Sequence, residues 1–182
     1  MHYCDYTATL PPDNPHRRYH DHEYGFPIAE DDRLFERLVF EINQAGLSWT
    51  TILNKADNLR RAYDHFAIAR VAAYGEADIA RLLADVGIIR NRRKIAAAIH
   101  NARIIRELQA AHGSFRAWLD AQAGADKAVW VKLFKKTFAF TGPEITGEFL
   151  MSSGYLEGAH RRDCPVYARI LAARPRWLTS GG

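Results

Sequence analysis

Apolar residues recur at three- and four-residue spacing through the long stretch from residue 28 to residue 142, which contains no proline. This spacing places apolar side chains on one helix face, and the absence of proline lets helices follow one another. The first two expected helices are 32–42, with Leu34, Phe35, Leu38, Val39 and Ile42 inward, and one from Trp49, with Ile52, Leu59, Tyr63 and Phe66. The next two are 77–85, with Ile79, Leu82 and Leu83, and one from Asn91 to about His112, with Ile95, Ile99, Ala102 and Ile105.

Three further helices are expected towards the C-terminus. One follows Ser114 and carries Phe115, Trp118 and Leu119, one covers 127–138, and one covers 143–152 with Pro143 at its first position. Asp31 or Asp32, Ser48 and Ser114 are expected to cap helices. Because no segment alternates apolar and polar residues over a strand's length, the pattern predicts an all-α fold. The first 30 and last 25 residues are expected to be irregular.

Size and composition indicate an ordinary globular protein. The 182 residues are 48% hydrophobic and 25% charged, which fits a single unit over 1–182, built of two intimate helical subdomains. No apolar run is long enough to span a membrane, and the N-terminus lacks a signal-peptide pattern, so we expect a cytoplasmic protein. The net charge of +4 is weakly in favour of an anionic partner.

The distribution of charge is more informative than the total. Residues 86–106 hold six basic side chains and no acidic one, and Gly87 centres the turn between two expected helices. A glycine turn followed by the free amides of a helix start can bind a phosphate, and arginines add attraction for nucleic acid. The alternative is a helical corner with a solvated basic face. The residues expected to contact a DNA phosphate are Gly87, Ile89, Arg90, Arg92 and Lys94.

The two cysteines, Cys4 and Cys164, lie near opposite ends of the chain, and each has a histidine at a ligand-like spacing. His160 and Cys164 would share one face of a helical turn, whereas the gap from Cys4 to His20 is long and unspecific. Two thiolates and two imidazoles would form a closed zinc site joining residues 1–30 to residues 155–182. Buried unliganded cysteines are the alternative, and a disulfide is disfavoured in the expected compartment.

A candidate pocket lies in the segment 40–49. Glu41 is near the C-terminal end of an apolar helix, where a carboxylate is unfavourable for the helix dipole, so it either faces solvent or serves a site. Trp49 follows a glycine turn and could present an aromatic face to a ligand or pack in the core. A metal at His20 would also fix Tyr19, Glu23 and Tyr24 nearby.

These segments, in this order, resemble the bacterial 3-methyladenine DNA glycosylase I family of the helix-hairpin-helix superfamily. The resemblance covers nearly the whole chain, and its most specific part is Glu41 followed by Gln-Ala-Gly-Leu-Ser-Trp over 44–49. The other matching pieces are Cys4, Tyr19 to Gly25, Asp85 to Ile95, Asn101 to Arg103, Phe138 to Gly142, and His160 with Cys164.

The resemblance implies a helix-hairpin-helix glycosylase fold with a structural zinc bound by Cys4, His20, His160 and Cys164. It implies that Glu41 is the catalytic and base-recognising glutamate, that Trp49 stacks on the base, and that Tyr19 and Tyr24 belong to the pocket. The implied activity is monofunctional removal of 3-methyladenine from double-stranded DNA, which leaves an abasic site. We expect a monomer without a protein partner, acting at the bacterial nucleoid.

The chain departs from the family mainly in 141–154, where residues 142–151 read Gly-Pro-Glu-Ile-Thr-Gly-Glu-Phe-Leu-Met and the family usually has Thr-x-x-Tyr-Ser-Phe-Met-Gln. His16 also stands where some members have a pocket tyrosine. A second hypothesis is therefore a paralogue that binds damaged DNA without excising a base. A third is a zinc hydrolase, which would need one of the four metal positions open.

Overall fold

The computed structural model describes residues 2–179, and over that range it contains helices joined by turns and loops, with no strand. The central helices are α3 (Asp31–Gln44), α4 (Trp49–Ala62), α5 (Ile68–Ala72), α6 (Glu76–Ala84) and α7 (Arg92–His112). They are followed by α8 (Phe115–Asp120), α9 (Lys127–Thr137) and α10 (Pro143–Ser152). Periodicity thus predicts these helices to within a few residues, apart from α5, which was not expected, and α10 has the expected bounds. The second helix ends earlier than expected, at Ala62, and a 3-10 turn over Asp64–Phe66 follows it.

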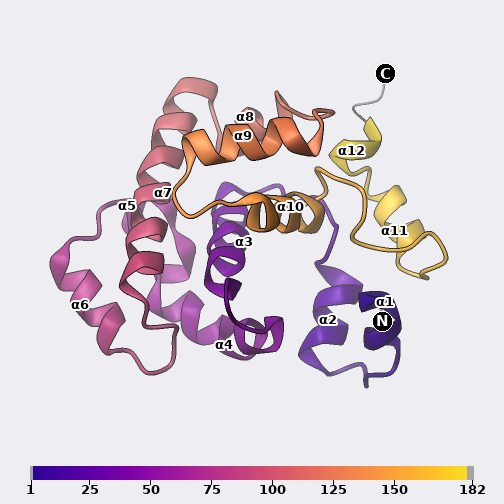
Figure 1. Ribbon diagram of the computed structural model, residues 1–182, viewed down its shortest axis with the longest axis horizontal. Coiled ribbons are helices and arrows are strands. Elements are labelled where there is room, and N and C mark those ends of the chain that lie inside the picture. Colours follow the sequence, from indigo (N-terminus) through magenta and orange to yellow (C-terminus); the bar gives the residue numbers. More distant parts are fainter. Residues whose placement is uncertain (1, 180–182) are drawn as a thin grey trace.

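Helix α3 lies at the centre of the molecule and contacts α4, α7, α8 and α10 (Figure 1). Leu34, Phe35, Leu38, Val39 and Ile42, the residues expected to face inward, are all fully buried. Each buried aliphatic or aromatic side chain of this kind contributes roughly 1.5–3 kcal/mol, so the α3 face is a major stabilising element. None of the helices in the described part of the chain is long and apolar enough to cross a membrane.

The expected caps are only partly confirmed. The Ser48 and Ser114 side chains accept from the Thr51 and Ala117 amides, as capping residues do. Asp31, in contrast, lies inside α3 and caps a distant helix, because its carboxylate accepts from the amides of Phe115 (2.8 Å) and Arg116 (2.9 Å). Asp32 likewise accepts from the Ile68 amide at the start of α5 (3.1 Å). These aspartates therefore fix α8 and α5 against α3.

The expectation that both ends of the chain are irregular is wrong. The N-terminal part contains α1 (Tyr3–Ala8) and α2 (Pro15–His22), and the C-terminal part contains α11 (Tyr167–Ala172) and α12 (Arg176–Thr179). The Asn14 side chain accepts from the His16 amide, and Pro15 occupies the first turn of α2, so α2 did carry a start signal. Figure 1 shows α1, α2 and α11 on one side of the molecule, away from α5 to α7.

Candidate active site and metal centre

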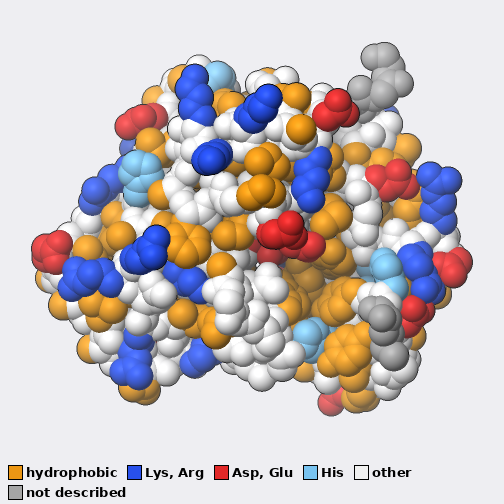
Figure 2. All heavy atoms as spheres, in the orientation of Figure 1, with side chains coloured by type: hydrophobic (Ala, Val, Ile, Leu, Met, Phe, Trp, Pro, Cys, Tyr) orange, Lys and Arg blue, Asp and Glu red, His pale blue; other side chains and the backbone are white. Residues whose placement is uncertain are grey.

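A cavity of about 400 Å³ opens between the N-terminal helices and the α3–α10 layer. Figure 2 shows a hollow in this region of the surface, bordered by acidic and hydrophobic side chains. Side chains from α1, α2, the turn after α2, α3, α4 and α10 line it: Tyr3, Tyr19, Tyr24, Glu41, Gln44, Trp49, Glu144 and Glu148. The cavity therefore combines aromatic rings with carboxylates, which suits a flat ligand that carries donors or positive charge.

The aromatic wall is continuous. The Tyr19 ring lies 5.1 Å from Trp49 and 5.5 Å from Tyr24, measured between centroids, and Tyr24 meets Tyr3 edge-on at 5.6 Å. Trp49 is the first residue of α4, directly after the Ser48 cap, so the helix start fixes its position. Its ring is partly exposed, whereas its Nε1 is buried without a hydrogen-bond partner among the described residues.

Glu41 is the buried carboxylate of this cavity, with 4% of its surface exposed. Burial raises the pKa of Glu41 to about 8, the nearby Arg37 cation opposes the rise, and Glu148 adds to it. Arg37 is itself buried one turn earlier on α3, where it donates to the Tyr19 hydroxyl and to Glu23, each at 3.2 Å. Its guanidinium also lies 5.0 Å from the centre of the Tyr19 ring. Arg37 thus orients Tyr19 and stabilises a charged Glu41.

The four residues expected at a base pocket, Glu41, Tyr19, Tyr24 and Trp49, are brought together in this one cavity. Tyr3 and Arg37 were not anticipated. The signal for Tyr3 was its position beside Cys4, and the signal for Arg37 was a cation on the otherwise apolar face of α3.

A second group of residues lies beside the cavity. Ligand atoms of Cys4, His20, His160 and Cys164 all lie within 4.8 Å of one another, and the four residues are buried. Cys164 Sγ is 3.7 Å from His20 Nε2 and 3.5 Å from His160 Nδ1, and Cys4 Sγ is 3.8 Å from His160 Nδ1. A tetrahedral ion with bonds of about 2.3 Å to sulfur and about 2.0 Å to nitrogen holds such atoms about 3.5 Å apart. The cluster therefore has the donors and spacing to hold a metal ion.

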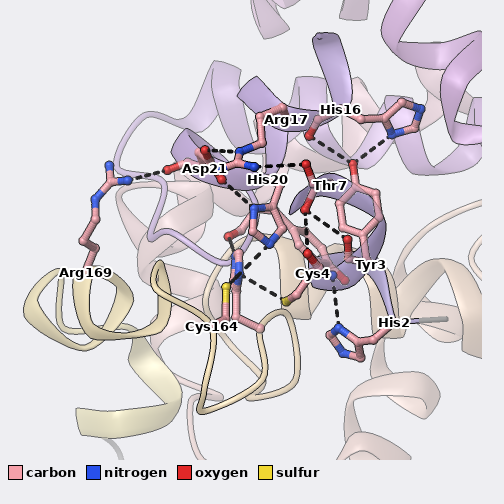
Figure 3. A network of polar contacts seen from close by, with 12 residues as sticks. His2, Tyr3, Cys4, Thr7, His16, Arg17, His20, Asp21, Cys164 and Arg169 are labelled. Atoms are coloured by element: carbon pink, nitrogen blue, oxygen red, sulfur yellow. Dashed lines mark hydrogen bonds and ion pairs between the residues drawn. The ribbon is translucent and has the colours of Figure 1, made fainter. Parts of the chain in front are cut away.

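The outer contacts of the cluster fix both imidazoles. His20 Nδ1 lies 2.6 Å from Asp21 (Figure 3). His160 Nε2 lies 2.7 Å from the Tyr24 carbonyl oxygen. Partners of this type set the tautomer that leaves the other ring nitrogen free for a metal. His160 and Cys164 lie in a loop of turns and bends, and not on the helical turn that their spacing suggested.

The basic hairpin between α6 and α7 only partly matches its prediction. The Ile89 and Arg90 amides make no hydrogen bond to another described residue, and Arg90 and Arg92 are exposed, as phosphate contacts require. The Gly87 amide, in contrast, donates to Asp85 at 2.8 Å. The prediction that Lys94 contacts a DNA phosphate is wrong. Its ammonium is buried and donates to the Asn43 and Ala45 carbonyls at 2.7 and 2.6 Å. Lys94 therefore fixes the loop before Trp49 and is not available to a phosphate.

Comparison with known proteins agrees with this geometry. The model of the methyladenine glycosylase family matches residues 10–167, which include every candidate site residue except Tyr3 and Cys4. The chain belongs to the methyladenine glycosylase family. A curated relative, DNA-3-methyladenine glycosylase 1 of Escherichia coli K12, is 34% identical over 82% of this chain and 89% of its own length.

Solved structures of family members have the same fold. The 3-methyladenine DNA glycosylase I of Staphylococcus aureus is 28% identical, with a TM-score of 0.79 over 91% of this chain and 97% of its own. A single-residue variant of a 3-methyladenine DNA glycosylase I, in complex with 3-methyladenine, is 29% identical, with a TM-score of 0.80 over the same shares. The all-helical fold expected from the sequence is thus that of the family.

Proposed function

We propose that this protein is a monofunctional DNA glycosylase that excises 3-methyladenine from double-stranded DNA. The observation that carries the proposal is Glu41, a buried carboxylate inside an aromatic-lined cavity of about 400 Å³, in a chain that belongs to the methyladenine glycosylase family. A base inside a duplex must leave the stack to reach such a cavity, and stacking on an aromatic ring recovers roughly 1–3 kcal/mol. Trp49 and Tyr19 supply that platform.

The chemistry follows from the charge of the lesion. Methylation at N3 makes adenine cationic while it is attached to the sugar, and the base leaves as a neutral molecule when the glycosidic bond breaks. Glu41 pairs with the cation and accepts a hydrogen bond from the exocyclic amine. The sugar carbon keeps the positive charge, water adds to it and releases a proton to solvent, and an abasic site remains. Because the leaving group is already activated, the reaction needs little further acid catalysis.

Zinc is the ion proposed for the cluster of Cys4, His20, His160 and Cys164. Two thiolates and two imidazoles at these spacings favour tetrahedral zinc, and four protein ligands leave no position for a substrate. The ion would contribute folding energy by joining α1 and α2 to the loop before α11. This closed ligand set argues against the zinc-hydrolase hypothesis.

DNA is the proposed partner. Its phosphates would bind at the Gly87 hairpin, to the Ile89 and Arg90 amides, which have no partner among the described residues, and to the Arg90 and Arg92 side chains. We expect the protein to act as a monomer, at the nucleoid in the cytoplasm.

The test is chromatography of the bases released from methylated duplex DNA. Wild-type protein should release free 3-methyladenine without nicking the strand, and Glu41→Gln should release little or none. Glu107→Gln, at an exposed position of α7, is a matched control that removes one carboxylate outside the cavity. Tight binding of an abasic analogue with no released base would instead support the paralogue that binds without excision.

A further inference from the structure

The turn between α6 and α7 is held in place through both backbone polar groups of Gly87. The Gly87 amide donates to Asp85 Oδ1 at 2.8 Å, and the Gly87 carbonyl oxygen accepts from two side chains of α4. The donors are Asn58 Nδ2 at 3.2 Å and Lys55 Nζ at 3.3 Å. Both side chains are half-buried, and Figure 1 shows the turn beside α4. The turn is therefore attached to α4 by specific hydrogen bonds.

Close contact with Asn58 also explains why a glycine stands at position 87. The Gly87 backbone is not left-handed, so a positive φ is not what favours glycine here. A Cβ atom added at Gly87 would lie 3.0 Å from Asn58 Nδ2 and 3.2 Å from Asn58 Cγ, closer than the usual van der Waals separation. The same Cβ atom would meet Asp85 Oδ1 at 3.0 Å. Glycine thus lets the backbone of the turn pack directly on α4.

A second link joins the other side of the turn to the segment that leads into α4. Lys94, in the first turn of α7, donates to two carbonyl oxygens of the loop 43–45. The amides proposed to bind a phosphate, those of Ile89 and Arg90, lie between these two attachments at Gly87 and Lys94. The phosphate site is therefore fixed on both sides to the segment that also forms the wall of the cavity.

Helix α4 carries both the attachment of the turn and the stacking platform of the cavity. Trp49 is the first residue of α4, and Asn58 follows nine residues later. At about 1.5 Å per residue, the helix holds these two positions about 14 Å apart along its axis. Because an intact helix keeps this length, the contact between Asn58 and Gly87 sets where the turn lies relative to Trp49.

We propose that Asn58, supported by Lys55, is a positioning residue that fixes the phosphate-binding turn relative to the cavity. A DNA backbone held by the turn then presents its base to Trp49. This inference rests on the proposed function for its DNA partner. Asn58 does not line the cavity, and it acts through the Gly87 carbonyl. Without its hydrogen bond, only the fraction of molecules whose turn stays in place binds DNA correctly, so the apparent affinity falls by that fraction.

The test separates binding of DNA from binding of the free base. Asn58→Leu keeps the shape of the side chain and removes its donor. Its affinity for a duplex that contains an uncleavable abasic analogue, measured by fluorescence anisotropy, should fall about three- to tenfold, as expected for one lost hydrogen bond. Its affinity for free 3-methyladenine, measured by calorimetry, should stay within about twofold of wild type, because the cavity is a separate site. Asn54→Leu, one turn earlier on α4 at an exposed position, is the matched control and should bind both ligands like wild type.

A pair of variants tests the contact itself. Gly87→Ala places its new Cβ against Asn58 and should weaken DNA binding, whereas Asn58→Ala removes the atoms that this Cβ meets. The contact with Asp85 is the same in both backgrounds and cancels in the comparison. The loss of DNA affinity caused by Gly87→Ala should therefore be at least about threefold smaller in the Asn58→Ala background than in wild type.

Three results would overturn the proposal. Unchanged DNA affinity in Asn58→Leu would mean that the hydrogen bond does not place the turn. A parallel loss of DNA and free-base affinity would assign Asn58 to the stability of the whole fold. Equal losses from Gly87→Ala in the two backgrounds would show that the contact is not sensed. A wild-type protein that binds DNA but releases no base would refute the proposed function and leave the comparison of DNA affinities intact.

Discussion

Replacing Glu41 with glutamine should stabilise the protein at neutral pH while abolishing base release. Glu41 is 4% exposed, and its side chain makes no hydrogen bond to another described residue. Burial raises the pKa of Glu41 from 4.5 to about 8. Between these two values the unfolded chain has lost a proton that the folded chain keeps, so the free energy of unfolding falls as the pH rises.

The magnitude follows from this interval. A solution at pH 7 lies 2.5 units above the unfolded pKa of 4.5, and at about 1.4 kcal/mol per unit this difference corresponds to about 3.5 kcal/mol. Glutamine cannot ionise, so the unfolding free energy of Glu41→Gln should not fall with pH in this way. Burial of the unpaired glutamine amide should cancel a part of the resulting gain in stability. We expect the variant to be roughly 1–3 kcal/mol more stable at pH 7 and close to wild type at pH 4.5.

Urea unfolding followed by tryptophan fluorescence at a series of pH values between about 4.5 and 8 measures this difference. The gap between the variant and wild type should widen steadily through that range. A gap that stays constant with pH would refute the argument, because it would mean that Glu41 ionises as readily in the folded protein as in the unfolded chain. Glu107→Gln should show no pH-dependent gap.

Further outcomes are expected at other residues. Trp49→Ala should slow base release by roughly 5- to 150-fold in single-turnover assays, the equivalent of a lost stacking interaction of 1–3 kcal/mol, and Trp49→Phe by much less. Cys164→Ser should lower both the bound zinc measured by mass spectrometry and the melting temperature; unchanged stability with a full metal complement would contradict the four-ligand cluster. Lys94→Met should cost roughly 1–3 kcal/mol of stability in denaturant titrations, because the Asn43 and Ala45 carbonyls lose their donor. Arg90→Ala should instead leave stability unchanged and weaken DNA binding for all sequences. It should also reduce the slope of the logarithm of the binding constant against the logarithm of the salt concentration by about one, because one phosphate contact is lost.

The parts of the fold that could be predicted from the sequence are those governed by local rules. Helix α3 repeats apolar residues along one face, and α10 begins with a proline that suits a first turn, so both could be located from sequence alone. For these two helices the determining signal lies within one or a few helical turns. Residue type alone suggested a metal site at Cys4 and Cys164, with buried unliganded cysteines as the alternative, and the family resemblance supplied the full set with His20 and His160.

The features that the sequence did not predict depend on distant contacts. Asp31 resembles a cap for its own helix, but the amides it binds are 84 and 85 residues away. Lys94 belongs to a basic cluster in sequence, yet packing of α7 against α3 directs it inward to two carbonyls. Helices α1 and α2 have only 6 and 8 residues, and such short segments depend on tertiary contacts for their stability.

The position of the cysteine–histidine cluster also constrains the order in which parts of the protein can fold during synthesis. Three of its members adjoin tyrosines of the cavity: Cys4 follows Tyr3, His20 follows Tyr19, and His160 contacts the Tyr24 carbonyl oxygen. The contact between Cys4 and His160 joins residues 156 positions apart. Contacts so distant in the chain form late, because closing a long loop costs entropy. The ribosome must therefore synthesise the chain as far as Cys164 before this cluster can hold the N-terminal tyrosines in the cavity, so the pocket is completed only after α3 and α10 have both been made.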